Sequence, residues 1–167
     1  MDKVLRVAML AFVLTLTGCV TQLAPQYDQA IADGLTSTNL QIQTLFVQIG
    51  SGSTKATYSS RMALYNKIVA ELNALEIQAR ARPAPPQDVL EKVDDALEKN
   101  GGAQMEVDPK FSSFPSARAI HDASDTIQHM RAQDEQAGLR AEALLAFKNQ
   151  VTVYMTQAIT YEAFRKR

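Results

Sequence analysis

Apolar residues recur every three or four positions along several long stretches of this chain, and this spacing constrains the fold more than any other feature. In residues 27–49 the apolar series is Tyr27, Ile31, Leu35, Thr38, Ile42, Leu45 and Ile49. At about 100° per residue, these positions fall on one side of an α-helix. A Gly-containing segment, residues 50–53, follows and is a typical helix stop. The spacing therefore predicts an amphipathic helix with one buried face.

A second long helix is predicted over residues 55–81. Its apolar face comprises Tyr58, Met62, Tyr65, Ile68, Val69, Leu72 and Leu75. The prolines that begin at Pro83 end it, because proline disfavours helix at the residue before it and lacks a backbone donor. A shorter helix is predicted over residues 86–99, where Val89, Val93 and Leu97 repeat every four positions.

Two further long helices are predicted in the last third of the chain. One spans residues 117 to about 136, with Ser116 as its N-cap. Its inner side comprises Ile120, Ile127 and Met130. The other spans residues 139–165, after a break at Gly138, with a stripe of Leu144, Phe147, Val151, Tyr154, Ala158 and Tyr161.

The connections between these segments predict their arrangement. No segment alternates with the period of a β-strand, and the links after the first and fourth helices are short, which favours antiparallel neighbours. We therefore expect an all-α fold, an up-down antiparallel helical bundle of four long helices plus one short inserted helix. Within it, Gly34 is expected to let a neighbouring backbone come close. Phe111 and Phe114 are expected to pin the loop over residues 103–115 onto the bundle.

Length, charge and cysteine content exclude several classes of protein. A chain of 167 residues suits one domain. A formal net charge of −1 lacks the basic footprint of a nucleic-acid-binding protein, so no nucleic-acid partner is expected. A single cysteine excludes an intramolecular disulfide and a zinc site built from several cysteines.

The N-terminus carries a targeting pattern. Lys3 and Arg6 precede an apolar run over residues 7–14, which is far shorter than the ~20 residues of a membrane-spanning helix and fits a secretory signal. The tetrapeptide Leu16-Thr17-Gly18-Cys19 follows. This arrangement resembles bacterial lipoprotein precursors, whose lipobox reads Leu, a small residue, Gly or Ala, then Cys. The alternative is an ordinary signal peptide with an unmodified cysteine.

The lipoprotein resemblance implies an anchor and a location. Cys19 is expected to receive a diacylglycerol group, and cleavage before Cys19 is expected to free an amine that is then acylated. Residues 1–18 are then a signal peptide, residues 19–26 a lipidated tether, and residues 27–167 the helical bundle domain. Val20 stands where Asp favours inner-membrane retention in enterobacterial lipoproteins, so the resemblance implies the outer membrane, facing the periplasm.

A weaker resemblance extends over most of the mature chain. Tyr27-Asp28 opens a helix after the cysteine, Arg80-Ala81-Arg82-Pro83 ends the second helix, and the C-terminal helix is basic at its end. This order is similar to small helical lipoproteins of uncharacterised function. It implies no catalytic residue.

One set of side chains could bind a metal ion. His121, Asp125 and His129 stand at i, i+4 and i+8 on one predicted helix, and imidazole and carboxylate are ligands of divalent transition metals. The set is turned away from Ile120, which favours a solvated polar face instead.

Other catalytic and cofactor patterns are missing from the sequence. There is no Glu-x-x-His pair for a di-iron bundle, no Gly-x-Ser-x-Gly nucleophile motif and no phosphate loop followed by Lys. Methionines at helical spacing are more often core residues than haem ligands. The sequence therefore predicts a protein that is not an enzyme and has no cofactor.

Two apolar residues lie opposite the main stripe of the first helix. Leu40 and Val47 are predicted either to pack beneath a loop, which we favour, or to form an exposed patch for a partner. Together these observations predict a lipid-anchored lipoprotein that acts non-enzymatically through contacts with an envelope protein. The alternative is a bundle that binds a small apolar ligand in its interior or, with less support, a metal ion.

Overall fold

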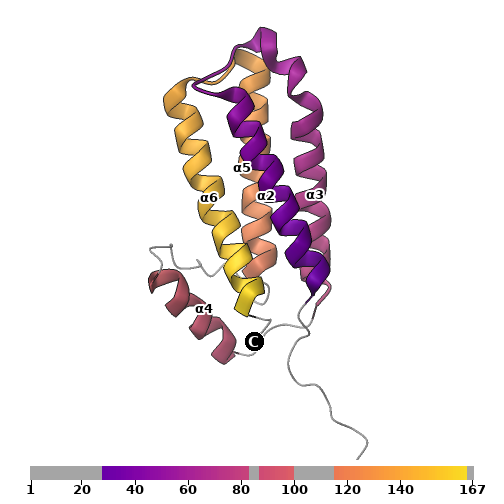
Figure 1. Ribbon diagram of the computed structural model, residues 1–167, viewed down its shortest axis with the longest axis vertical. Coiled ribbons are helices and arrows are strands. Elements are labelled where there is room, and N and C mark those ends of the chain that lie inside the picture. The colour runs from indigo at the N-terminus through magenta and orange to yellow at the C-terminus, as the bar shows by residue number, and fades with distance from the viewer. Residues whose placement is uncertain (1–27, 83–86, 100–114, 165–167) are drawn as a thin grey trace, which may run out of the picture.

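Residues 28–82, 87–99 and 115–164 are described by the computed structural model, and every regular element within them is helical. The elements in chain order are α2 (Gln29–Ile49), the 3₁₀-helix η2 (Lys55–Ser60), α3 (Met62–Arg80), α4 (Gln87–Lys99), α5 (Pro115–Ala137) and α6 (Ala141–Phe164). The four long helices stand side by side with alternating direction, and α4 packs against the lower end of α6 (Figure 1). The predicted all-α antiparallel bundle with one short inserted helix is confirmed.

Each long helix has two neighbours among the other long helices. Helix α2 packs against α3 and α6, and α5 packs against the same two helices from the opposite corner. The axis of the bundle is filled by buried side chains, of which the largest are Tyr65, Ile31, Leu35, Ile42, Leu45, Ile68, Leu72, Ile120, Ile127 and Met130. A smaller cluster joins Val93 and Leu97 of α4 to Tyr161 of α6. The apolar stripes of the sequence therefore meet in one core, with α4 attached at its edge.

Helix α2 follows its predicted course closely. Asp28 caps it, because its carboxylate accepts hydrogen bonds from the backbone N–H groups of Ala30 and Ile31. Gly50 ends it with a φ of +64°, a left-handed conformation that glycine adopts without strain. Thr38, the one polar member of the stripe, is buried and donates to Glu71 of α3.

The predicted helix over residues 55–81 is wrong in its first turns. A 3₁₀-helix over Lys55–Ser60 precedes α3, and Arg61 between them is the C-cap of the first and the N-cap of the second. Thr57 bonds back to Thr54 through its side chain, and such local bonds compete with an α-helix. Met62 begins α3 about 100° round from the centre of its buried side, so it is 46% exposed rather than part of the core.

Two predictions about α5 have different outcomes. Ser116 is not the N-cap, because the helix begins at Pro115 and Ser116 is a buried residue of its first turn. Proline suits a first-turn position because it has no backbone donor to lose. The break at Gly138 is confirmed, with a φ of +80° and the Ser53 carbonyl too close to admit a Cβ.

Gly34 makes a different close contact from the one expected. A Cβ at this position would lie 2.6 Å from Cδ2 of Leu75, so glycine admits a side chain of α3 rather than its backbone. Four predicted features lie outside the described residues: the signal peptide, the tether with Cys19, the loop with Phe111 and Phe114, and the basic end at Arg165-Lys166-Arg167. None of the described helices is both long enough and apolar enough to cross a bilayer.

Candidate functional site

The outer surface shared by α2 and α6 is the part of the bundle with the most exposed apolar side chains. Leu40 and Val47 of α2 are 68% and 80% exposed, and Leu145 and Val153 of α6 are 59% and 38% exposed. Both side chains are thus exposed, in agreement with the alternative of an exposed patch; the loop with Phe111 and Phe114 that was expected to cover them lies outside the described residues. The sequence could not decide this, because covering a second stripe depends on where a distant loop runs.

Helical geometry places these four residues on one face. Phe46 of α2 and Lys148 of α6 meet across the contact between the two helices, with the Lys148 amine 6.0 Å from the ring centre. From Phe46, Leu40 and Val47 lie about 100–120° further round α2. From Lys148, Leu145 and Val153 lie about 60–140° further round α6. Because neighbouring antiparallel helices turn in opposite senses, both sets point outward on the same side of the bundle.

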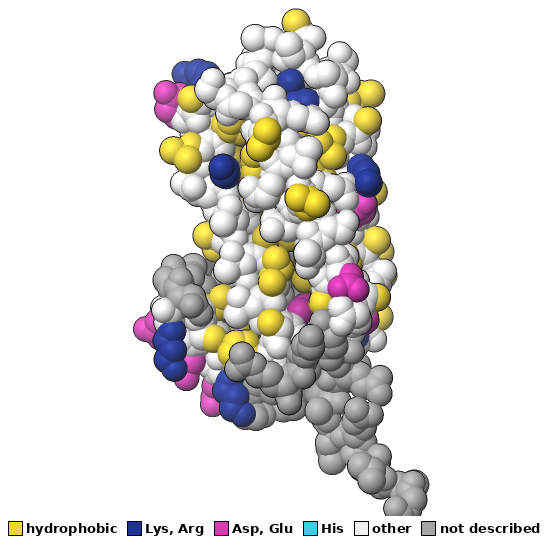
Figure 2. Space-filling view, viewed as in Figure 1, with side chains coloured by type: hydrophobic (Ala, Val, Ile, Leu, Met, Phe, Trp, Pro, Cys, Tyr) yellow, Lys and Arg dark blue, Asp and Glu magenta, His cyan; other side chains and the backbone are white. Residues whose placement is uncertain are grey.

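We name this surface the α2/α6 face and define it by its exposed residues. Its apolar members are Leu40, Val47, Leu145 and Val153. Between them lie the uncharged polar residues Thr36, Asn149, Thr152 and Thr156. Figure 2 looks onto this side of the bundle, where hydrophobic and uncharged surface predominates and a few charged side chains are interspersed.

The α2/α6 face is also poor in charge. Helix α2 has one charged residue and α6 has three, whereas α3 has four and α5 has six. The exposed charges of the first pair are Asp33 near the start of α2 and Glu142 and Lys148 near the start of α6. Depletion of charge and exposure of aliphatic side chains are the compositional marks of a protein interface.

The predicted metal candidates do not converge on one point. His121 is about one-third exposed; its Nδ1 lies 3.1 Å from Glu76 Oε2 of α3 and its Nε2 lies 3.4 Å from Asp125 Oδ2. His129 is exposed and two turns further along α5. Among the described residues, no three His, Cys, Asp or Glu side chains are placed to hold a metal ion. Glu76, which sequence spacing could not reveal, takes the position beside His121.

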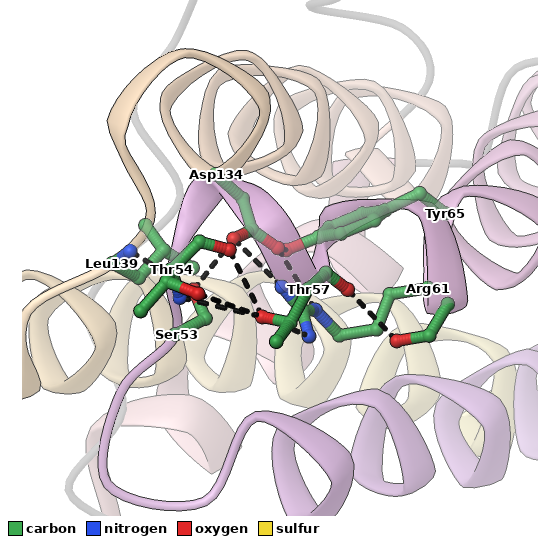
Figure 3. A network of polar contacts seen from close by, with 8 residues as sticks. Ser53, Thr54, Thr57, Arg61, Tyr65, Asp134 and Leu139 are labelled. Carbon is green, nitrogen blue, oxygen red and sulfur yellow. Dashed lines mark hydrogen bonds and ion pairs between the residues drawn. The ribbon is translucent and has the colours of Figure 1, made fainter.

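A buried carboxylate at the upper end of the bundle is the most elaborate polar cluster (Figure 3). Asp134 of α5 is fully buried and forms a bidentate pair with Arg61, through Nη2 at 2.9 Å and Nε at 3.0 Å. It also accepts hydrogen bonds from Ser53 Oγ at 2.5 Å and Tyr65 Oη at 3.2 Å. These four donors fill the acceptor positions of the carboxylate.

This cluster connects separate segments rather than facing a substrate. Ser53 also exchanges two hydrogen bonds with the Leu139 backbone, so the loop after α2 is fixed to the start of α6. Burial, reinforced by the charge of Asp134, raises the pKa of Tyr65, so its hydroxyl remains a neutral donor. We call this cluster of Ser53, Arg61, Tyr65, Asp134 and Leu139 the structural lock. The sequence did not reveal it because its members are up to 86 residues apart.

A second buried ion pair lies at the opposite end. Arg82 bonds to both oxygens of Glu162, at 2.5 and 2.7 Å, and to Ser116 Oγ at 3.1 Å. Burial alone would lower the pKa of Arg82, but the bonds and charge of Glu162 outweigh it and raise the pKa. The pair joins the end of α3 to α5 and α6. Each end of the bundle is therefore held by a buried ion pair.

A hollow near the upper end offers little chemistry. It measures about 340 Å³, is open to solvent, and is lined by Ser51, Gly52, Ser53, Thr54, Thr57 and Leu139. The Ser53 and Thr57 hydroxyls are already engaged in the lock. We therefore take the α2/α6 face as the candidate functional site. No known protein family, curated protein or solved structure matches this chain.

Proposed function

We propose that this chain is a lipoprotein anchored through acylated Cys19, in the outer membrane and facing the periplasm, which acts non-enzymatically through protein contacts of the α2/α6 face. The observation that carries the proposal is the exposed, charge-poor surface that α2 and α6 share. The lipobox Leu16-Thr17-Gly18-Cys19 supports the anchor.

The energetics of the face suit a partner of modest affinity. Burying a large aliphatic side chain completely yields roughly 1.5–3 kcal/mol. Leu40 and Val47 retain most of their exposure, so covering both would contribute roughly 2–4 kcal/mol. That contribution is small for a complex in solution, where association costs several kcal/mol. Anchoring to a membrane offsets part of this cost by raising the local concentration of the partners.

The alternative of a small apolar ligand in the interior has less support. The axis between the four long helices is occupied by buried side chains, and Tyr65 and Leu72 are fully buried there. A ligand in the interior would have to displace such side chains. Because protein cores are densely packed, this displacement would cost free energy. Protein contact through the exterior requires no such rearrangement.

Two experiments test the two halves of the proposal. For the anchor, cells that express the chain are fed labelled palmitate, and label is expected on the wild type but not on Cys19→Ser. Equal labelling of both, or of neither, refutes the anchor. For the surface, a photo-crosslinking residue is placed at Leu40 or Val47 in cells.

The matched control for crosslinking is Ile77, an apolar residue of α3 that is 69% exposed and lies off the α2/α6 face. Discrete protein adducts are expected from positions 40 and 47 and not from position 77. Adducts of equal yield from all three positions contradict a specific surface, and so does the absence of any adduct.

A further inference from the structure

The charge pattern of the α2/α6 face bears on the identity of its partner. A symmetric dimer brings the same patch of both copies together, so the patch must be complementary to itself. From residue 34 to residue 49 on α2, and from residue 149 to residue 161 on α6, there is no charged side chain. Its exposed charges are Asp33, Glu142 and Lys148, and apart from these three the face presents no like charges that repel a second copy. The side-chain amide of Asn149 both donates and accepts, so it can pair with its own copy, whereas the Thr36 and Thr152 hydroxyls already donate to backbone carbonyls and can only accept.

The direction of the helices is compatible with two copies on one membrane. The chain enters α2 at Asp28, nine residues after Cys19, so the anchor reaches the bundle at the lower end of α2. A two-fold axis parallel to the helices would place α2 of one copy beside α6 of the other. It would also keep both Asp28 ends pointing the same way, toward a shared bilayer. An axis perpendicular to the helices would point the two anchors in opposite directions.

The size of the face suits a dimer that depends on the anchor. Helices of 21 and 24 residues are about 32 and 36 Å long. Two helices packed about 9 Å apart present a strip about 18 Å wide, or about 600 Å² per copy. Stable interfaces bury about 800 Å² per partner, so this face lies at the low end. Two copies confined to one membrane gain the effective concentration that such an interface needs.

We propose that the partner of the α2/α6 face is a second copy of this chain, paired side by side on the membrane; this inference rests on the proposed lipid anchor. The other exposed apolar residues described on the bundle, Met62 and Ile77, stand near opposite ends of α3 and form no comparable strip.

Cysteine crosslinking of the full-length chain in lipid vesicles tests the pairing. Cys19 is the only cysteine, so its acylation leaves the wild type without a free thiol. The variant Val47→Cys is treated with a short bis-maleimide, and Ala70→Cys, at an exposed position of α3, is the matched control. A covalent dimer is expected from Val47→Cys and not from Ala70→Cys. Equal dimer from both, or none from either, overturns the proposal.

A second substitution tests the face without disturbing the fold. Leu40→Glu, added to Val47→Cys, is expected to lower the dimer yield at least about tenfold, because it buries an unpaired carboxylate in the pairing. Ile77→Glu, at an equally exposed position, is expected to leave the yield unchanged. If both lower the yield equally, or neither does, the proposal fails.

Two readouts distinguish failure of the pairing from failure of the anchor. A fluorophore on Val47→Cys that is quenched by brominated lipid tails shows that the face lies against the bilayer, which overturns pairing with a second copy. Reaction of the wild type with maleimide shows that Cys19 is free and refutes the anchor. In that case the variants are compared again in a Cys19→Ser background, with the chains held on the vesicles by an N-terminal histidine tag and nickel-chelating lipid. Loss of the Val47→Cys dimer there overturns the pairing separately.

Discussion

Replacing Asp134 with asparagine tests whether the buried ion pair holds the upper end of the bundle together. The carboxylate is fully buried and accepts four hydrogen bonds, two of them from Arg61, which is 5% exposed. The asparagine amide would leave the Arg61 guanidinium without a countercharge. Its own NH₂ group would also face hydrogen-bond donors instead of acceptors. Breaking a buried pair by changing one partner costs about 3–5 kcal/mol. In a domain of this size, that lowers Tm by about 10–18 °C.

The assay is thermal unfolding of the full-length chain in mild detergent, followed by circular dichroism at 222 nm. Glu135→Gln is the matched control, because it neutralises the next carboxylate on α5, which is exposed. It is expected to change the free energy of unfolding by less than about 0.5 kcal/mol. The far-ultraviolet spectrum below the transition should stay helical in both variants.

A double replacement makes the reasoning refutable. Arg61→Leu and Asp134→Leu together remove both charges, and apolar replacement of a buried pair is often nearly neutral. Tyr65 and Ser53 still lose an acceptor, at about 1 kcal/mol each. The double variant should therefore lose much less than the sum of the two single changes. A fully additive loss, or a loss below about 1 kcal/mol for Asp134→Asn, would show that the pair does not act as a unit.

Three further predictions concern single positions. Tyr65→Phe removes one buried hydrogen bond and should cost about 0.5–1.5 kcal/mol at pH 8. Because the pKa of Tyr65 is raised, its hydroxyl stays protonated in the folded chain above pH ~10, whereas it deprotonates in the unfolded chain. The free energy of unfolding of the wild type should therefore fall by up to about 1.4 kcal/mol per pH unit above pH ~10. Denaturant titrations should show the gap between the two proteins closing by pH ~11; a constant gap would contradict the assignment. Glu162→Gln should cost about 3–5 kcal/mol by leaving Arg82 buried without a countercharge, and a Tm unchanged within error would speak against a lock at that end. Gly138→Ala should destabilise the fold by about 2–4 kcal/mol, because the new Cβ would meet backbone atoms. Gly50→Ala, which has a similar φ but open space around it, should cost only about 1–2 kcal/mol. Equal losses on thermal melting would show that the backbone contact at Gly138 adds nothing to the cost.

The sequence predicted the α2 part of the candidate surface but not the α6 part. Leu40 and Val47 could be identified as a second apolar stripe from spacing alone, because the helical period fixes which residues share a side of one helix. Leu145 and Val153 were not connected with them, because the residues of α6 that flank α2 depend on how the two helices pack. The exposure of Leu40 and Val47 also depends on tertiary packing, so spacing alone could not decide it.

The sequence by itself determined what depends on neighbours along the chain. The period of the apolar residues gave the helices and their buried sides, Gly50 and Gly138 gave two of the breaks, and short links gave the antiparallel order. The predicted lipobox, Leu16-Thr17-Gly18-Cys19, is likewise a local pattern. The tertiary structure decided what depends on contacts between distant residues. Arg61 with Asp134, and Arg82 with Glu162, are pairs 73 and 80 residues apart, and no local rule states which buried charge meets which. The shared exposure of α2 and α6 arises in the same way, because a surface belongs to two helices only after they have packed.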